Sequence, residues 1–89
     1  MTKLINKGDV LYWSRIVPET GIYEVNELKI RTIEDKYFVG VDKKSRQAFL
    51  FSHSALDNII FSDREDALRQ VIDAEKNKKD FTEIYYEED

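Results

Sequence analysis

Cysteine is absent from this chain of 89 residues, which has one histidine, one proline and three glycines. Without cysteine the chain has no disulfide scaffold, no thiolate zinc site and no cysteine nucleophile, which fits a reducing compartment. Gly8, Gly21 and Gly40 lie too far apart to form a Gly-rich phosphate loop. No uncharged apolar run could span a bilayer, and residues 1–9 lack the apolar core of a signal peptide. We therefore expect a cytoplasmic protein that makes no membrane contact.

Residues that could carry catalysis or bind a metal are scarce. Ser52 and Ser54 flank His53, the only histidine, but neighbours along an extended chain point to opposite faces and form no nucleophile–base pair. The segment HSALD is predicted to be a loop or a short helical turn. The terminal acids Glu87, Glu88 and Asp89 lack the fixed oxygen cage of a cation site. We expect no enzymatic activity, no catalytic residue, no metal site and no cofactor.

The net charge of -4 is concentrated at the C-terminal end. Residues 80–89 contain five acids and no base, so residues 1–79 are close to neutral, at about +1. We divide the chain into one domain, residues 1–79, and an acidic aromatic tail, residues 80–89, because a chain of this length supports a single core. The tail sequence FTEIYYEED fits either a helix or a strand.

β-Branched and aromatic residues predict several short strands between the N-terminal region and Phe61. In Ile22–Ile33 the apolar alternation shifts by one residue at Asn26–Glu27, which predicts a β-bulge there. Alternatively, the two halves of this strand bury opposite faces. The strands are expected at Val10–Val17, Ile22–Ile33, Lys36–Val41, Ala48–Ser52 and Ile59–Phe61, with Pro18 and Gly21 ending the first.

A two-residue turn at Glu34–Asp35 would fix the register of the next hairpin. Ile30 would then face Val39, and Leu28 would face Val41, on the buried side of the sheet. Phe38 would lie on the outer side, opposite Arg31, with Lys29 nearby. In the following strand, Phe49 and Phe51 are expected to point inward.

A helix is predicted from Asp63 to about Lys78. Ser62 and Glu65 have the spacing of a capping box, and the acids after Ser62 complement the positive end of the helix dipole. Four apolar residues fall on one stripe at helical spacing, which predicts that the first turns pack on the strands. These residues are Ala67, Leu68, Val71 and Ile72.

Two stretches, GDVLYW and IIFSDREDAL, resemble the first strand and the C-terminal helix of small SH3-like barrel proteins of Gram-positive bacteria and their phages or prophages. The resemblance covers Gly8 to about Glu75 and implies a fold and a mobile-element origin, but no activity. Together with the strand pattern, it predicts a mainly β fold, an SH3-like antiparallel barrel of about five strands with a C-terminal α-helix. The long second strand and the acidic tail depart from this pattern.

Two kinds of partner are compatible with the sequence. The first is a protein, contacted through spare aromatic side chains at Trp13, Phe38, Tyr85 and Tyr86, because surface aromatics anchor interfaces. Such an accessory or adaptor protein would be a monomer or weak homodimer and could inhibit a host factor, with the acidic tail engaging a basic surface. The alternative is nucleic acid, bound by Lys29, Arg31 and Phe38 through phosphate contact and base stacking.

Overall fold

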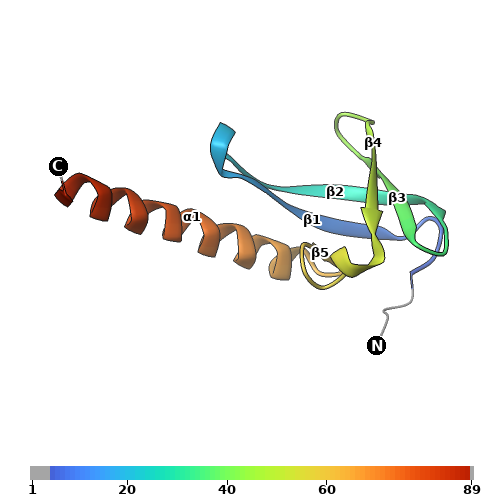
Figure 1. Ribbon diagram of the computed structural model, residues 1–89. Coiled ribbons are helices and arrows are strands. Elements are labelled where there is room, and N and C mark those ends of the chain that lie inside the picture. Colours follow the sequence, from blue (N-terminus) through green and yellow to red (C-terminus); the bar gives the residue numbers. More distant parts are fainter. Residues whose placement is uncertain (1–4, 89) are drawn as a thin grey trace.

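The computed structural model describes the backbone of residues 5–88 and the side chains of residues 5–77. Over these residues the chain forms five strands, two 3-10 helices and one α-helix (Figure 1). In chain order they are β1 (Val10–Val17), η1 (Pro18–Thr20), β2 (Ile22–Ile33), β3 (Tyr37–Asp42), β4 (Ala48–Ser52), η2 (His53–Ala55), β5 (Ile60–Phe61) and α1 (Arg64–Glu88).

The strands form one antiparallel sheet in the order β4-β3-β2-β1-β5. The predicted mainly β fold of five strands with a C-terminal helix is therefore confirmed. The turn at Pro18 and Gly21 is also confirmed, because Gly21 adopts a φ of 73° and its N–H bonds to the carbonyl of Pro18. In this sheet order β4 and β5 are the two edges, so closure into a barrel stays a prediction.

The predicted bulge at Asn26–Glu27 is wrong. β1 pairs with β2 without interruption from Val10–Lys29 to Val17–Ile22. The register shift lies further along β2, between Ile30 and Thr32, where β2 pairs with β3. The extra residue there is Arg31. With one residue inserted, Ile30 and Ile33 both reach the inner face of the sheet.

The predicted register of the β2–β3 hairpin is also wrong. The N–H of Glu34 bonds to the carbonyl of Tyr37 at 2.8 Å, so the turn is made by residues 35–36. Ile33 pairs with Phe38, and Ile30 pairs with Gly40. Phe38 therefore points into the core, and its side chain has no exposed surface. A turn displaced by one residue reverses which side chains of β3 are buried.

The main core lies on the inner face of the curved sheet. Phe38 and Phe51 stack there with ring centroids 5.6 Å apart, and Phe49 packs against the same cluster, so the inward orientation of both β4 phenylalanines is confirmed. Gly40 makes room for Leu28, whose Cβ would lie 3.2 Å from a Cβ added at Gly40. The buried residues of this cluster are Leu11, Leu28, Ile30, Phe38, Phe51 and Ile60.

The opposite, outer face of β1 and β2 packs against α1. The hydroxyl of Ser14 donates a 2.8 Å hydrogen bond to the carbonyl of Ala67, and both residues are buried. Val25 pairs with Ser14 and lies on the same face. Leu28 and Ile30 point to the inner face instead. The two halves of β2 thus bury opposite faces, in agreement with the alternative to a bulge at Asn26–Glu27.

Helix α1 contacts the sheet through a narrower stripe than predicted. Ala67 and Val71 are buried, but Leu68 is 36% exposed and Ile72 is 52% exposed. Glu65 and Asp66 occupy the first turn, at the positive end of the helix dipole. The helix continues past Lys78 to Glu88 because the sequence after Asp63 contains neither proline nor glycine to end it.

The long helix gives the molecule an extended shape. A helix of 25 residues is about 37 Å long, and its distal turns extend beyond the strands (Figure 1). The radius of gyration is 15.1 Å, whereas a compact chain of this length would have one of about 12 Å. The C-terminal end of α1 therefore lies at the opposite end of the molecule from β3 and β4 (Figure 1).

Candidate basic groove

A groove of about 690 Å³ lies on the outer face of the sheet, where β2 and β3 meet the turn after β3. Four basic residues line it, together with backbone and apolar surface. Its lining residues are Gly8, Lys29, Ile30, Arg31, Val41, Asp42, Lys43 and Arg46. We refer to these residues as the basic groove.

Strand β2 supplies two of the cations. Lys29 pairs with Val10 on one side and with Val41 on the other. Because Leu28 and Ile30 point into the core, the alternation of the strand directs Lys29 outward. Arg31 is the bulged residue, and its side chain is exposed. The burial of Leu28 and Ile30 on the inner face thus leaves Lys29 and Arg31 on the groove side of β2.

The turn between β3 and β4 supplies the other two cations, Lys43 and Arg46. The N–H of Arg46 donates to the carbonyl of Asp42 at 2.8 Å, and the N–H of Asp42 donates to the carbonyl of Gln47 at 2.8 Å. Arg46 has a φ of 63°, in the left-handed region that few side chains adopt. The turn therefore holds Arg46 in an uncommon conformation at the rim of the groove.

The buried carboxylate of Asp42 organises this turn. One oxygen, Oδ1, accepts hydrogen bonds from the N–H groups of Lys44 at 2.7 Å and Ser45 at 3.0 Å, and Oδ2 accepts one from the side-chain amide of Asn26 at 2.6 Å. Burial alone would raise the pKa of Asp42. The hydrogen bonds from Ser45, Asn26 and Lys44, with the positive charge of Arg15, outweigh burial and lower the pKa. Asp42 therefore stays ionised at neutral pH.

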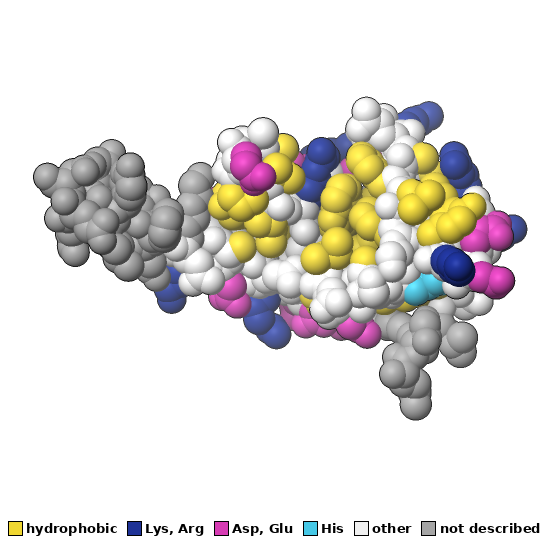
Figure 2. Space-filling view, in the orientation of Figure 1, with side chains coloured by type: hydrophobic (Ala, Val, Ile, Leu, Met, Phe, Trp, Pro, Cys, Tyr) yellow, Lys and Arg dark blue, Asp and Glu magenta, His cyan; other side chains and the backbone are white. Residues whose placement is uncertain are grey.

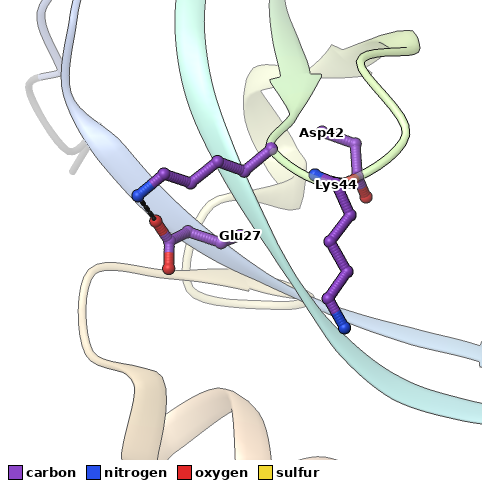
Figure 3. Close-up of polar contacts among 4 residues, drawn as sticks. Glu27, Asp42 and Lys44 are labelled. Atoms are coloured by element: carbon purple, nitrogen blue, oxygen red, sulfur yellow. Dashed lines mark hydrogen bonds and ion pairs between the residues drawn. The ribbon is translucent and has the colours of Figure 1, made fainter.

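Lys43 is the one groove cation with an ion-pair partner among the described side chains. Its Nζ lies 2.8 Å from Oε2 of Glu27, the contact drawn as a dashed line in Figure 3. This hydrogen bond and the charge of Glu27 raise the pKa of Lys43. Among residues 5–77 the other ion pair joins Arg69 to Asp66, outside the groove. Lys29, Arg31 and Arg46 consequently present their charge to any ligand of the groove.

A second hollow, of about 300 Å³, lies between β2, the turn after β3 and the start of α1. Both acidic and basic side chains line it, so it does not present charge of one sign. Its lining residues are Glu24, Val25, Asn26, Glu27, Lys43, Lys44 and Arg64. Elsewhere on the face seen in Figure 2, acidic and basic side chains are interspersed, and hydrophobic side chains gather in several separate groups.

The structure separates the residues that were predicted to form a nucleic-acid face. Lys29 and Arg31 both lie in the basic groove. Phe38 does not join them, because it lies in the core with no exposed surface. The prediction of Phe38 as a partner-binding or base-stacking residue is therefore wrong, for the same reason as the hairpin register. The side chains of Tyr85 and Tyr86 lie outside the described residues.

Trp13 is half-buried and closes one side of the core. Its ring centroid lies 5.0 Å from those of Phe49 and Phe51. The guanidinium of Arg15 lies over two of these rings, 5.3 Å from the Trp13 ring centroid and 5.7 Å from that of Phe49. These contacts give Trp13 a role in packing the core.

His53 lies in η2, as expected for a loop or short helical turn at HSALD. Its Nε2 lies 2.7 Å from the carbonyl oxygen of Glu34, so Nε2 carries the proton of this hydrogen bond. The imidazole also packs 5.7 Å from the Phe38 ring. It lines neither of the two hollows described above, and the described residues contain no cluster of three or more metal-ligating side chains.

The sequence pattern joins two of the groove cations, Lys29 and Arg31, with Phe38 and does not link them to Lys43 or Arg46. The signal that could have joined them is Asp42, whose carboxylate accepts hydrogen bonds from the turn after β3 and from Asn26 of β2.

No protein-family model, no curated protein and no solved structure matches this chain. Among the described residues, no helix combines the length and the apolar character that crossing a bilayer requires.

Proposed function

We propose that this protein is a non-enzymatic binding module whose basic groove contacts an acidic segment of a protein partner. The observation that carries this proposal is the convergence of four cations on one groove, where Lys43 is the one paired to a carboxylate among the described side chains. An acidic segment would gain close ionic contacts with the other three without displacing an existing ion pair.

The apolar surface around the groove favours a protein over a nucleic acid. Val41 lines the groove, and Val10, which pairs with Lys29 on the same face, is 41% exposed. Such side chains contact apolar residues of a peptide, whereas single-stranded nucleic acids stack their bases on aromatic side chains beside the cations. Phe38, the aromatic predicted for that purpose, is buried. A protein partner can thus contact both the cations and the apolar side chains of this surface.

The resemblance of GDVLYW and IIFSDREDAL supports a phage or prophage origin, and we add to the proposal an accessory or adaptor role, including inhibition of a host factor. A cytoplasmic location fits the composition of the chain. Both statements belong to the proposal.

Binding of a labelled peptide of alternating glutamate and tyrosine, followed by fluorescence anisotropy at low salt, tests the proposed function. The double variant Lys29→Glu/Arg31→Glu should weaken binding at least about ten-fold, because like charges would then face the peptide. The control, Lys36→Glu, changes an exposed charge outside the groove and should leave the affinity within about two-fold. No binding by the wild type, or equal binding by both variants, would contradict the proposal.

Nucleic acid is the second candidate, because Lys29 and Arg31 do lie together in the groove. Labelled single- and double-stranded oligonucleotides would compete with the peptide at low salt if phosphates bind there, and their affinity would fall steeply as salt rises. Oligonucleotides that bind the wild type more tightly than the peptide would replace the protein-partner proposal with this one.

A further inference from the structure

We infer that the basic groove takes the acidic C-terminal segment, residues 80–89, of a second copy of this chain. The inference rests on the proposed function and names the partner. It makes the protein a head-to-tail self-associating module, with one groove and one ligand segment in each copy.

The segment and the groove are complementary in chemistry. Residues 80–89 contain five acids and no base, and four large apolar residues are interspersed among the acids. The groove presents four basic side chains together with Val41. Its own carboxylate, Asp42, is occupied by hydrogen bonds from Lys44, Ser45 and Asn26, so it does not compete for the cations. The acids of the segment can therefore pair with the groove cations while its apolar residues contact Val41.

The fold keeps this segment away from the groove of its own molecule. Helix α1 packs on β1, β2 and β5, and its buried residues Ala67 and Val71 lie in the first turns. The rest of the helix leads away from the sheet, so the C-terminal end and the β3–β4 end lie at opposite ends of the molecule (Figure 1). The helix would have to break for the segment to bind its own groove. A second molecule meets no such obstacle.

This arrangement defines the type of assembly. The groove of one copy and the segment of the next are different surfaces, so the contact is heterologous and leaves one unused groove and one unused segment at the ends of an open oligomer. Such contacts build rings if the rotation closes and open chains if it does not. Association should therefore grow with protein concentration and weaken with salt.

Sedimentation velocity of full-length chains provides the test. The groove variant is Lys29→Glu/Arg31→Glu, and the segment variant is Glu83→Gln/Glu87→Gln/Glu88→Gln. The wild type should form oligomers at low salt, and raising the salt to about 0.5 M should weaken association at least about ten-fold. Each variant alone should sediment as a monomer under conditions in which the wild type associates.

An equal mixture of the two variants gives the decisive result. The segment variant keeps an intact groove, and the groove variant keeps an intact segment, so the mixture should form a one-to-one dimer and nothing larger. The control Lys36→Glu changes an exposed charge outside the groove and should assemble like the wild type. Circular dichroism spectra matching the wild type would show that each variant is folded.

A wild type that stays monomeric at every concentration, or variants that assemble like the wild type, would overturn the inference. The glutamate–tyrosine peptide separates this failure from a failure of the proposed function. If the peptide binds the wild-type groove while the chain stays monomeric, the groove binds acidic segments of another protein. If neither occurs, both proposals fall.

Discussion

At the scale of single residues, Asp42 shows how this fold accommodates a buried charge. Removing a carboxylate from water costs several kcal/mol unless hydrogen bonds replace its hydration. Three donors do so here, and together they fasten the turn after β3 to β2. Because this turn carries Lys43 and Arg46, the carboxylate also fixes the position of these two groove cations.

The pH dependence of stability should reveal this carboxylate. The folded-state pKa of Asp42 is lowered, so its stabilisation is complete above the unfolded pKa of about 3.9 and is lost as the pH falls through the folded value. We expect Asp42→Asn to reduce the free energy of unfolding at pH 7 by about 1–3 kcal/mol and to flatten its decline below about pH 4. Urea denaturation from pH 7 to pH 2 measures both effects.

Asp35→Asn, at an exposed turn, is the matched control for this experiment and should keep the wild-type profile. An Asp42→Asn protein with wild-type stability at pH 7 would contradict the role given to the carboxylate.

Phe38 and Tyr37 are neighbours in β3 with opposite environments, so substitutions at the two positions test the register of the β2–β3 hairpin. Phe38 has no exposed surface, whereas Tyr37 is 36% exposed. Replacing Phe38 by alanine should lower the free energy of unfolding by about 3–5 kcal/mol, and Phe38→Leu should lower it less while keeping the protein folded. Tyr37→Ala should cost about 1 kcal/mol or less. Comparable losses at Phe38 and Tyr37 in urea denaturation would show that the hairpin register is different.

At the scale of elements, Gly40 explains how β2 and β3 pack so closely. A Cβ at this position would lie 3.2 Å from the Cβ of Leu28 and 3.3 Å from its Cδ1. Leu28 is fully buried, so its packed neighbours oppose a shift of its side chain. We therefore expect Gly40→Ala to destabilise the fold by about 1–3 kcal/mol in thermal or urea unfolding, as overpacking does. Equal or greater stability would show that Leu28 has room to shift.

Helix α1 offers a second comparison within one element. Val71 faces the sheet and is 4% exposed, whereas the adjacent Ile72 is 52% exposed. Val71→Ala should cost about 1–2 kcal/mol through the lost packing, and Ile72→Ala should cost less than about 0.5 kcal/mol although it removes more atoms. Urea denaturation of both variants tests which stripe of the helix packs. A larger loss at Ile72 would support the broader stripe inferred from the sequence.

The sequence is sufficient to predict the elements but not how they pair. All five strands and the helix are recognisable because β-branched runs, turn residues and helical spacing act locally. The hairpin register is not recognisable, because the inner face of β3 consists of Phe38, Gly40 and Asp42. A glycine and an acid make that face look exposed by hydropathy, and only the partners Leu28 and Asn26, from β2, explain their burial.

The same reasoning explains what could be predicted of the basic groove. Lys29 was predicted to be exposed because its neighbours Leu28 and Ile30 are apolar, and this holds in either register. The bulge at Arg31 and the left-handed conformation of Arg46 depend on contacts between strands, which no local pattern records. The sequence therefore points to Lys29 and Arg31, but not to their convergence with Lys43 and Arg46 in one groove.

At the scale of the whole molecule, folding and the C-terminal segment are separable. Among the described side chains, those buried against the sheet lie in the first turns of α1. At low concentration and high salt, a chain ending at Lys79 should therefore unfold within about 0.5 kcal/mol of the full chain. Urea denaturation measures this difference. A loss above about 2 kcal/mol would show that residues 80–89 contribute to the fold.

The position of Trp13 provides an intrinsic optical probe. It is the only tryptophan of the chain, and it lies beneath Arg15 against Phe49 and Phe51, on the face of the sheet opposite Lys29. Its fluorescence will change when the core opens and water reaches the indole, but a ligand on the far face will leave the emission unaltered. One fluorophore, without any label, can therefore distinguish loss of the fold from occupation of the groove.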